Sequence, residues 1–438
     1  MTPTIWTRLK IGVALAAMLA QVSAGPAAAF CGFYVAKADS KLFNKSSKVV
    51  LTRDGNQTAI TMASDYEGEA REFALVIPVP TFIERKQIGV VDSTTVDHLD
   101  AYSAPRLVEY HDEDPCRPIP IPAPMMATAS GRVHGSFIEG SRYQGVTVEA
   151  SYDVGEYDVS ILSATENNGL VSWLTDNGYK IPDRAGPVLG SYIKQNMHFF
   201  IAKVNLDRMK LIGAGYLRPL QVRYETPKFM LPLRLGTVNS NGPQDLIVYA
   251  LTKNGRVEAA NYPNVKLPSG MDVPLYVKDE FGKFYKALFE RAVARENMRA
   301  VFVEYAWDMG WCDPCAAQPL SNKELVELGA RWIGDDSDEA VTRGVPAFVT
   351  RLHVRYDAQS FPEDITFLET RDRENFQGRY VLRHPWQGEA TCQAAQAYRD
   401  QLPAAFLHQA TNLAQLTGWP REEIEARMEA AGQSQKPR

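Results

Sequence analysis

The stretch "SKVVLTRDGNQTAITMASDY", residues Ser47–Tyr66, decides the fold class. Two runs rich in β-branched residues flank Asp54 and Gly55, a dipeptide that strongly favours a tight β-hairpin turn. A further run, "EFALVIPVP" over Glu72–Pro80, has the composition of a strand and ends at its prolines. We therefore expect the fold to begin with an antiparallel sheet.

Strands and helices alternate over the rest of the chain. Further strands are predicted at residues 146–164, 198–206, 217–225, 245–262 and 300–307, and a helix at residues 166–177. Residues 279–298 carry apolar side chains at helical spacing, a stripe typical of a helix that packs on a sheet rather than of a cofactor site: Phe281, Phe284, Tyr285, Leu288, Phe289 and Ala292. The predicted class is α+β, with mostly antiparallel sheets, amphipathic helices packed on them, and a helical C-terminal tail from Glu389 onward.

The first 29 residues have the pattern of a secretory signal peptide. Arg8 and Lys10 precede an apolar run over Ile11–Val22, and small residues then lead to an Ala-x-Ala cleavage site ending at Ala29. Cleavage leaves 409 residues (438 − 29), in which no apolar stretch reaches the roughly 18 residues that cross a bilayer. We expect the mature chain to be exported to the periplasm or the extracellular space, without a transmembrane segment.

Proline-rich sequence suggests how the mature chain is divided. "DEDPCRPIPIPAPMM", residues Asp112–Met126, is too rich in proline for a regular helix or strand and therefore predicts a long loop. We expect a β-rich unit over residues 30–126 that ends in this loop, a central α+β unit over residues 127–278, and a C-terminal α+β unit over residues 279–430.

The cysteines suggest at least one disulfide. An exported chain meets an oxidising compartment, where cysteines pair by default. The mature chain has an odd number of them: Cys31, Cys116, Cys312, Cys315 and Cys392. The sequence does not fix their connectivity. A local Cys312–Cys315 pair is favoured, with Cys31–Cys116 as a further pair because both cysteines flank the N-terminal β unit.

The stretch around Cys312 and Cys315 resembles a thioredoxin active site. A predicted strand, "VFVEYAW", is followed by "WCDPC", and "TRGVPAFV" downstream offers Pro346 where thioredoxins carry a cis-proline. In such a site Cys312 would attack as a thiolate and Cys315 would resolve the mixed disulfide.

Three features argue against this redox interpretation. Ser321 and Glu324 form an S-x-x-E capping box, so the next helix is predicted to begin well after the cysteines, where its dipole cannot stabilise a thiolate. Only 31 residues (346 − 315) separate Cys315 from Pro346, too few for the helix, strand and helix of thioredoxin. Asp313 between the cysteines would also disfavour a thiolate. A structural cysteine loop is therefore the favoured interpretation.

No other motif indicates a cofactor, a metal or a nucleic-acid partner. The chain has one closely spaced cysteine pair and no histidine at ligand spacing from it, whereas structural zinc takes four ligands. It contains no G-x-S-x-G, H-E-x-x-H, P-loop or dinucleotide-binding sequence. With 52 acidic and 47 basic residues, its charge does not favour nucleic acid. We predict no cofactor and no metal.

Several phrases together resemble one bacterial family. They include "FCGFYVAKADSKLFNKSSKVVL", "EFALVIPVP", "EYHDEDPC", "VSWLTDNGYKIP", "WCDPC", "TRLHVRY", "FPEDITF" and "RYVLRHPW". In this order, over nearly the whole mature chain, they are similar to the exported bacterial proteins grouped as domain of unknown function 2330. The resemblance implies export and one continuous architecture, and it implies no activity.

Two functional hypotheses follow from the sequence. The first is a non-catalytic exported envelope protein, a binding or structural module that is stabilised by a disulfide and recognises a protein or a small molecule. The alternative is a periplasmic thiol–disulfide oxidoreductase that uses Cys312 and Cys315, with Pro346 beside them. The sequence leaves open whether the chain is an enzyme.

Overall fold

The computed structural model describes residues 33–36, 43–67, 73–117, 147–164, 167–179, 181–182, 184–211, 217–240, 242–311, 313, 318–334 and 346–434. Over these residues it combines helices with several sheets, in which most strand pairs are antiparallel. The predicted α+β class with mostly antiparallel sheet is therefore confirmed.

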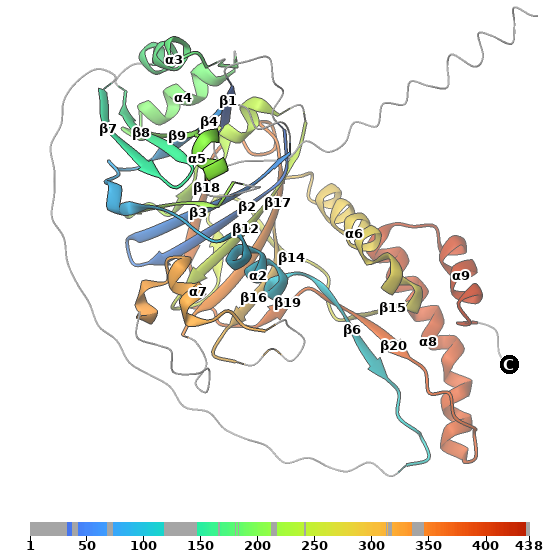
Figure 1. Cartoon of the computed structure of the whole chain (residues 1–438). Helices are drawn as coiled ribbons and strands as arrows, with labels where there is room; N and C mark the ends of the chain where they lie inside the picture. Colours follow the sequence, from blue (N-terminus) through green and yellow to red (C-terminus); the bar gives the residue numbers. More distant parts are fainter. Residues whose placement is uncertain are drawn as a thin grey trace, which may run out of the picture.

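A nine-stranded sheet forms the centre of the molecule (Figure 1). Its strands run in the order β14 (Asn264–Lys266), β16 (Val301–Asp308), β17 (Phe348–Tyr356), β12 (Gln244–Thr252), β2 (Phe43–Asp54), β3 (Gln57–Glu67), β10 (Leu220–Glu225) and β5 (Ile88–Val90), with β19 (Phe376–Gln377) paired to β16. Asp54 lies opposite Gln57 and Gly55 has a φ of 56°, so the predicted hairpin turn is confirmed.

A second, five-stranded antiparallel sheet packs against one face of the central sheet. Its order is β1 (Phe33–Ala36), β4 (Phe73–Val79), β9 (His198–Val204), β8 (Tyr157–Ser163) and β7 (Thr147–Val154). The core between the sheets includes Val49 and Leu51 from β2 and Ile77 from β4. Helices α3 (Asn167–Asp176) and α4 (Ala185–Ile193) cover the other face of this second sheet (Figure 1).

The opposite face of the central sheet carries two different layers. Val50, which lies between the inward-facing Val49 and Leu51, points to this side because side chains alternate along a strand. Near β2 and β12 the covering elements are α2 (Ser93–Ser103), α7 (Asn322–Glu327) and the 3₁₀ turn η5 (Arg331–Ile333). We call them the α2–α7 layer.

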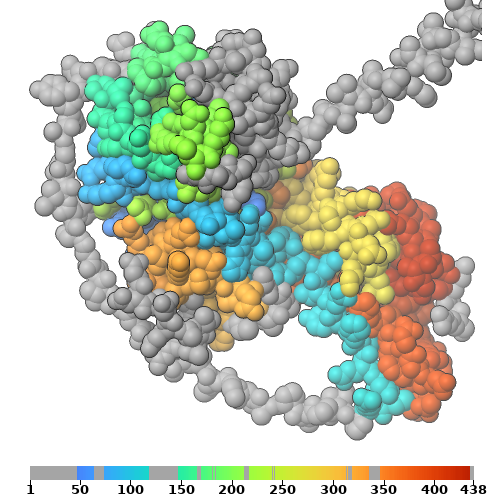
Figure 2. Space-filling model, in the orientation of Figure 1, coloured from blue at the N-terminus to red at the C-terminus, as the bar shows by residue number. Residues whose placement is uncertain are grey.

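The second layer, which we call the C-terminal layer, packs near β14 and β16. A parallel sheet of β15 (Met271–Val273), β20 (Arg379–His384) and β6 (Arg106–His111) joins the helices η4 (Leu275–Glu280), α6 (Phe281–Arg295), α8 (Gln393–Thr417) and α9 (Arg421–Ala430). In α6 the predicted stripe is confirmed, since Phe284, Leu288 and Phe289 are buried. Figure 2 shows this layer as a lobe beside the two large sheets.

The smaller elements complete the described chain. They are the sheet of β11 (Met230–Leu231), β18 (Ile365–Glu369) and β13 (Val257–Ala259), the short helix α5 (Leu206–Leu211) and the 3₁₀ turns η2 (Arg85–Gln87) and η3 (Arg234–Asn239). None of the helices described has both the length and the apolar composition that crossing a membrane requires.

A disulfide joins Cys116, beyond the end of β6, to Cys392 at the start of α8, with 6.0 Å between their Cα atoms. The proposed Cys31–Cys116 pairing is therefore wrong. It was inferred from the positions of the cysteines in the sequence, whereas the parallel pairing of β6 with β20 brings residue 116 close to the segment that follows β20.

Candidate ligand-binding pocket

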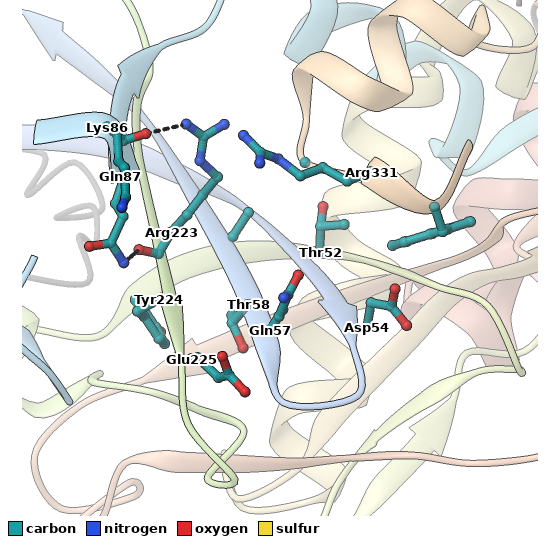
Figure 3. A pocket seen from close by; sticks show the side chains of 13 residues that line it. Thr52, Asp54, Gln57, Thr58, Lys86, Gln87, Arg223, Tyr224, Glu225 and Arg331 are labelled. Atoms are coloured by element: carbon teal, nitrogen blue, oxygen red, sulfur yellow. Dashed lines mark hydrogen bonds between the residues drawn. The ribbon is translucent and has the colours of Figure 1, made fainter. Parts of the chain in front are cut away.

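A hollow of about 390 Å³ lies where the β2–β3 hairpin and β10 meet the α2–α7 layer (Figure 3). The hairpin, strand β10, turn η2 and the turn after α7 all contribute lining residues. These are Thr52, Asp54, Gln57, Thr58, Ala59, Lys86, Gln87, Arg223, Tyr224, Glu225, Gly329, Arg331 and Trp332.

Small residues leave the space that forms the pocket. Ala59 on β3 lies directly opposite Thr52 on β2 and Arg223 on β10. The small Ala59 side chain therefore lies between the short Thr52 and the long Arg223 side chains. Gly329 approaches this row with a φ of 102°, and a Cβ atom at that position would lie 2.5 Å from the Cβ of Ala59. Only glycine therefore fits both the backbone conformation and the close approach.

Buried hydrogen bonds fix the turn after α7 on the sheet. The Thr52 hydroxyl donates to the Leu328 carbonyl over 2.7 Å, and the Gln221 amide donates to the Glu327 carbonyl over 2.8 Å. Ser321 and Glu324 form the capping box that begins α7, as the sequence predicts. The pocket wall on this side is thus held by specific polar contacts as well as by apolar packing.

Two arginines face each other across the hollow. In Figure 3 the guanidinium groups of Arg223 and Arg331 point toward one another from opposite walls. Arg223 donates one hydrogen bond, to the Lys86 carbonyl over 2.7 Å, and its own carbonyl accepts one from Gln87 over 2.9 Å. Among the residues that the structure describes, neither guanidinium group forms an ion pair. Partial burial, together with the positive charge of Arg331, lowers the pKa of Arg223 below its usual value.

The other end of the pocket carries two carboxylates. Asp54 is paired with Lys253 over 2.7 Å, and the Lys253 ammonium group lies 5.5 Å from the centre of the Trp332 ring. Glu225 has no ion-pair partner within the described chain. The hollow is therefore electrically polarised, with arginines at one end and one uncompensated carboxylate at the other.

The structure places the predicted redox residues only in part. Cys31, Cys312 and Cys315 lie outside the described residues. Pro346 is exposed, and its carbonyl accepts a hydrogen bond from the Trp332 indole over 2.9 Å. The backbone N–H of Met309 donates to the carbonyl of Ala347, so Pro346 lies close to the end of β16.

Asp313, between the two cysteines, is held against the central sheet. Its carboxylate accepts hydrogen bonds from the Tyr305 hydroxyl over 3.1 Å and from the Gln377 amide over 2.8 Å. Burial is the main cause that raises the pKa of Tyr305, and the carboxylate of Asp313 adds to it.

A buried ionic cluster joins the two layers that cover the central sheet. Glu304, fully buried on β16, accepts from the Arg351 guanidinium over 2.5 Å, contacts the His353 ring over 2.6 Å, and accepts from the Tyr285 hydroxyl of α6. Arg351 also pairs with Asp100 of α2. Burial alone would raise the pKa of Glu304, yet the charges of His353 and Arg351 lower it to about 2.

This cluster has a structural role. Every member lies on the central sheet or on an element packed against it, and Glu304 has no exposed surface that could meet a ligand. Within the described chain, no group of three or more histidine, cysteine, aspartate or glutamate side chains is arranged to hold a metal ion.

Comparison with known proteins identifies the family. The model of a family described as "uncharacterized protein conserved in bacteria (DUF2330)" matches residues 25–368. The chain belongs to this family. The DUF2330 match includes every residue that lines the pocket and ends before β20 and α8. No curated protein and no solved structure matches the chain.

Sequence reasoning missed Arg223 and Arg331. Arg223 lies in a segment that was predicted to be a strand, and its alternation with Tyr224 and Glu225 places Arg223 and Glu225 on one face. Gly329, directly after a capped helix, is a signal that the chain turns back and brings Arg331 with it. Neither pattern indicates that the two arginines meet, because their segments are more than 100 positions apart.

Proposed function

We propose that this chain is an exported bacterial protein that binds a small molecule in the pocket between β10 and η5. The observation that carries the proposal is the pair of guanidinium groups, Arg223 and Arg331, which point at each other at an open hollow lined by strands, turns and the hairpin. The volume of about 390 Å³ lies within the range typical of small-molecule sites, about 300–1,000 Å³.

The rigidity of the pocket supports a binding role. Arg223 lies on a strand that pairs with β3 on one side and with β5 on the other. Arg331 follows Gly329, whose close contact with Ala59 fixes the turn. A site whose hydrogen-bond donors are already positioned loses less conformational entropy when its ligand binds.

Export is proposed from the sequence, and the disulfide is consistent with it. Residues 1–29 have the charged start, apolar run and small-residue exit of a signal peptide. The Cys116–Cys392 bond is of the kind that persists in oxidising compartments. The test is to express the full chain in a bacterium and to read the N-terminus of the periplasmic or secreted product by mass spectrometry. A product that begins at Phe30 supports export, and an intact N-terminus in the cytoplasm contradicts it.

The binding role is tested with a pocket-filling variant. Gln57 lines the pocket and is exposed, so Gln57→Trp fills the hollow on a strand that tolerates aromatic residues, while Gln57→Ala is its matched control. We expect at least one compound in a panel of metabolites of differing charge to raise the Tm of residues 30–438. Gln57→Trp should abolish the rise and Gln57→Ala should keep it. A panel in which no compound raises the Tm contradicts the binding role.

One observation favours a thiol–disulfide oxidoreductase as the second candidate. The hydrogen bond between Met309 and Ala347 brings Pro346 close to the strand end from which the Cys312–Cys315 stretch departs. Helix α7, however, begins only at Asn322, and the Asp313 carboxylate is already held by Tyr305 and Gln377.

Thiol mapping separates the two candidates. Mass spectrometry of the exported chain, with and without mild dithiothreitol, reports which cysteines are paired and which pair is labile. A Cys312–Cys315 bond that opens readily, while Cys116–Cys392 stays closed, supports the redox function. A pair that resists reduction contradicts it.

A further inference from the structure

We propose that the ligand carries one carboxylate or phosphate group, which binds between the guanidinium groups of Arg223 and Arg331. The proposal rests on the proposed binding function, since it names the chemistry of the ligand that the same pocket takes.

The first argument is the unused hydrogen-bonding capacity of the two arginines. A guanidinium group has five N–H donors. The Arg223 side chain donates to the Lys86 carbonyl, and among the described residues the Arg331 side chain donates to nothing. Apart from the Arg223 bond to Lys86, the N–H groups of both guanidinium groups therefore have no protein acceptor among the described residues and are available to a ligand.

The second argument is electrostatic. Arg223 is partly buried and Arg331 is exposed, and two cations that face each other repel. On the partly buried side of the hollow this repulsion is stronger than in bulk water. An oxyanion bound between the two guanidinium groups attracts both of them and offsets their mutual repulsion. Arginine presents paired N–H groups that match the two oxygens of a carboxylate or phosphate, so Arg223 and Arg331 together suit such a group better than they suit chloride.

The third argument concerns the neighbouring charges. Lys86 already pairs with Glu84 over 2.8 Å and is largely exposed, so it contributes less to the cationic end than the two arginines do. Glu225 follows Arg223 by two residues on the same face of β10, which places their Cα atoms about 7 Å apart. Glu225 therefore faces the other end of any ligand longer than a few atoms.

The carboxylate of Glu225 restricts what that other end can be. A second anionic group would be repelled there, whereas a hydroxyl or ammonium group would be accepted, and Asp54 is already neutralised by Lys253. The geometry thus points to a small molecule that is anionic at one end and neutral or cationic at the other. It argues against polyanions such as nucleic acids.

The experiment measures the Tm of the disulfide-bonded chain, residues 30–438, against concentration of four probes at low ionic strength. Inorganic phosphate and propionate test the two kinds of oxyanion. β-Alanine adds an ammonium group to a carboxylate, and propylamine carries the ammonium group alone. A ligand that binds only the folded chain raises the Tm in proportion to its occupancy, so the titrations yield relative affinities.

Substitutions at the two arginines should weaken the oxyanions specifically. Arg223→Gln and Arg331→Gln should each lower the affinity for phosphate or for the carboxylates about tenfold or more, because each removes a charge-assisted hydrogen bond. Arg223→Lys and Arg331→Lys should retain part of that affinity because they keep the charge. Arg299→Gln, an exposed arginine outside the pocket, makes the same change in net charge and should leave the affinity unchanged.

Glu225→Gln provides the opposite test. It should strengthen the binding of phosphate, which Glu225 repels, and weaken the preference for β-alanine over propionate, which Glu225 favours. Whether phosphate or the carboxylates respond more to the arginine substitutions identifies which oxyanion the site takes.

Three outcomes would overturn the proposal, and they differ in whether the binding function survives. If neither phosphate nor a carboxylate binds, while a neutral or cationic compound binds and is lost in Gln57→Trp, the oxyanion proposal is wrong and the binding function stands. If no compound of any charge binds, both are wrong. Oxyanion binding that survives in the double variant Arg223→Gln/Arg331→Gln would also refute the proposal, since it places the anion elsewhere. Circular dichroism checks that each variant is folded.

Discussion

The central sheet is covered on one face by two layers that are attached in contrasting ways. The α2–α7 layer packs through apolar side chains and adds side chain to backbone hydrogen bonds, such as Thr52 to Leu328 and Gln221 to Glu327, and it leaves a hollow beside these bonds. The C-terminal layer packs through an apolar stripe of α6 and is cross-linked within itself by the Cys116–Cys392 disulfide.

The contrast shows how one face of a sheet can leave room for a ligand at one place and support a tightly packed layer at another. Apolar side chains fill the space between the elements that they join, and a filled space cannot receive a ligand. Directional hydrogen bonds can hold two elements at a fixed separation beside an opening, provided that every buried group has a partner. The ionic cluster around Glu304 lies where the layers meet, since it contacts α6 through Tyr285 and α2 through Arg351 and Asp100.

Breaking this junction should have the largest effect. Arg351→Met leaves Glu304 and Asp100 without their shared cation, and a buried charge that loses its partner destabilises a protein by about 3–5 kcal/mol. We expect the free energy of unfolding, measured by urea titration, to fall by this amount. Both layers should become less protected against hydrogen exchange.

Arg355→Met is the matched control for this prediction. Arg355 lies on the same strand and pairs with Asp245, but it is partly exposed, so its loss should cost about 1 kcal/mol or less. If the two variants lose equal stability, the cluster around Glu304 has no special role in joining the layers.

Removing the disulfide should lower the global stability and loosen the C-terminal layer while leaving the pocket in place. Cys116→Ser/Cys392→Ser frees a very long loop in the unfolded chain, and the resulting gain in entropy lowers stability by about 2–4 kcal/mol. Hydrogen exchange should increase in α8 and β20, while any ligand of the pocket keeps its affinity. A loss of ligand affinity in this variant would show that the two layers are not independent.

Lowering the pH should have the next largest effect, because it weakens the ionic cluster around Glu304 that joins the two layers. Burial would raise the pKa of Asp100, but its neighbours Arg351 and Lys48 lower it to about 2, and the pKa of Glu304 is likewise about 2. Because both values lie below those of the unfolded chain, the stabilisation is complete above about pH 4.5 and is lost as the pH falls toward 2. Each group contributes about 2 kcal/mol or more over this range.

The acid dependence can be checked by urea titrations between pH 5 and 2.5, carried out on the wild type and on Arg351→Met. The variant should lose less stability with acid, since Arg351 is a cause of both lowered pKa values. Parallel pH profiles would mean that Arg351 does not set them.

Local patterns predicted the elements, and the contacts between distant segments went unpredicted. The hairpin at Asp54 and Gly55, the stripe on α6 and the capping box at Ser321 each depend on residues a few positions apart, so the sequence displays them directly. The pairing of Cys116 with Cys392 requires β6 to lie beside β20, which no local spacing encodes.

The candidate site was missed for the same reason. Arg223 lies in a segment that the sequence predicts as an ordinary strand, and no local motif singles out Arg331. Their significance depends on the packing of Gly329 against Ala59, which is a property of the assembled sheet and layer.

The smallest effect is expected from a substitution that changes the shape of the pocket and leaves its charge unchanged. Gly329→Ala adds a Cβ atom both at a φ of 102° and in contact with Ala59, so the turn that carries Arg331 must shift. We expect a loss of about 1–3 kcal/mol from the free energy of unfolding, together with weaker binding of any ligand that Arg331 contacts.

Gly334→Ala is the control, because Gly334 also has a positive φ, 78°, but has open space where the Cβ would lie. It should show the backbone cost alone and leave binding intact. Equal effects of the two substitutions on binding would mean that the close approach of Gly329 to the sheet does not position Arg331. The turn after α7 would then have no part in shaping the pocket.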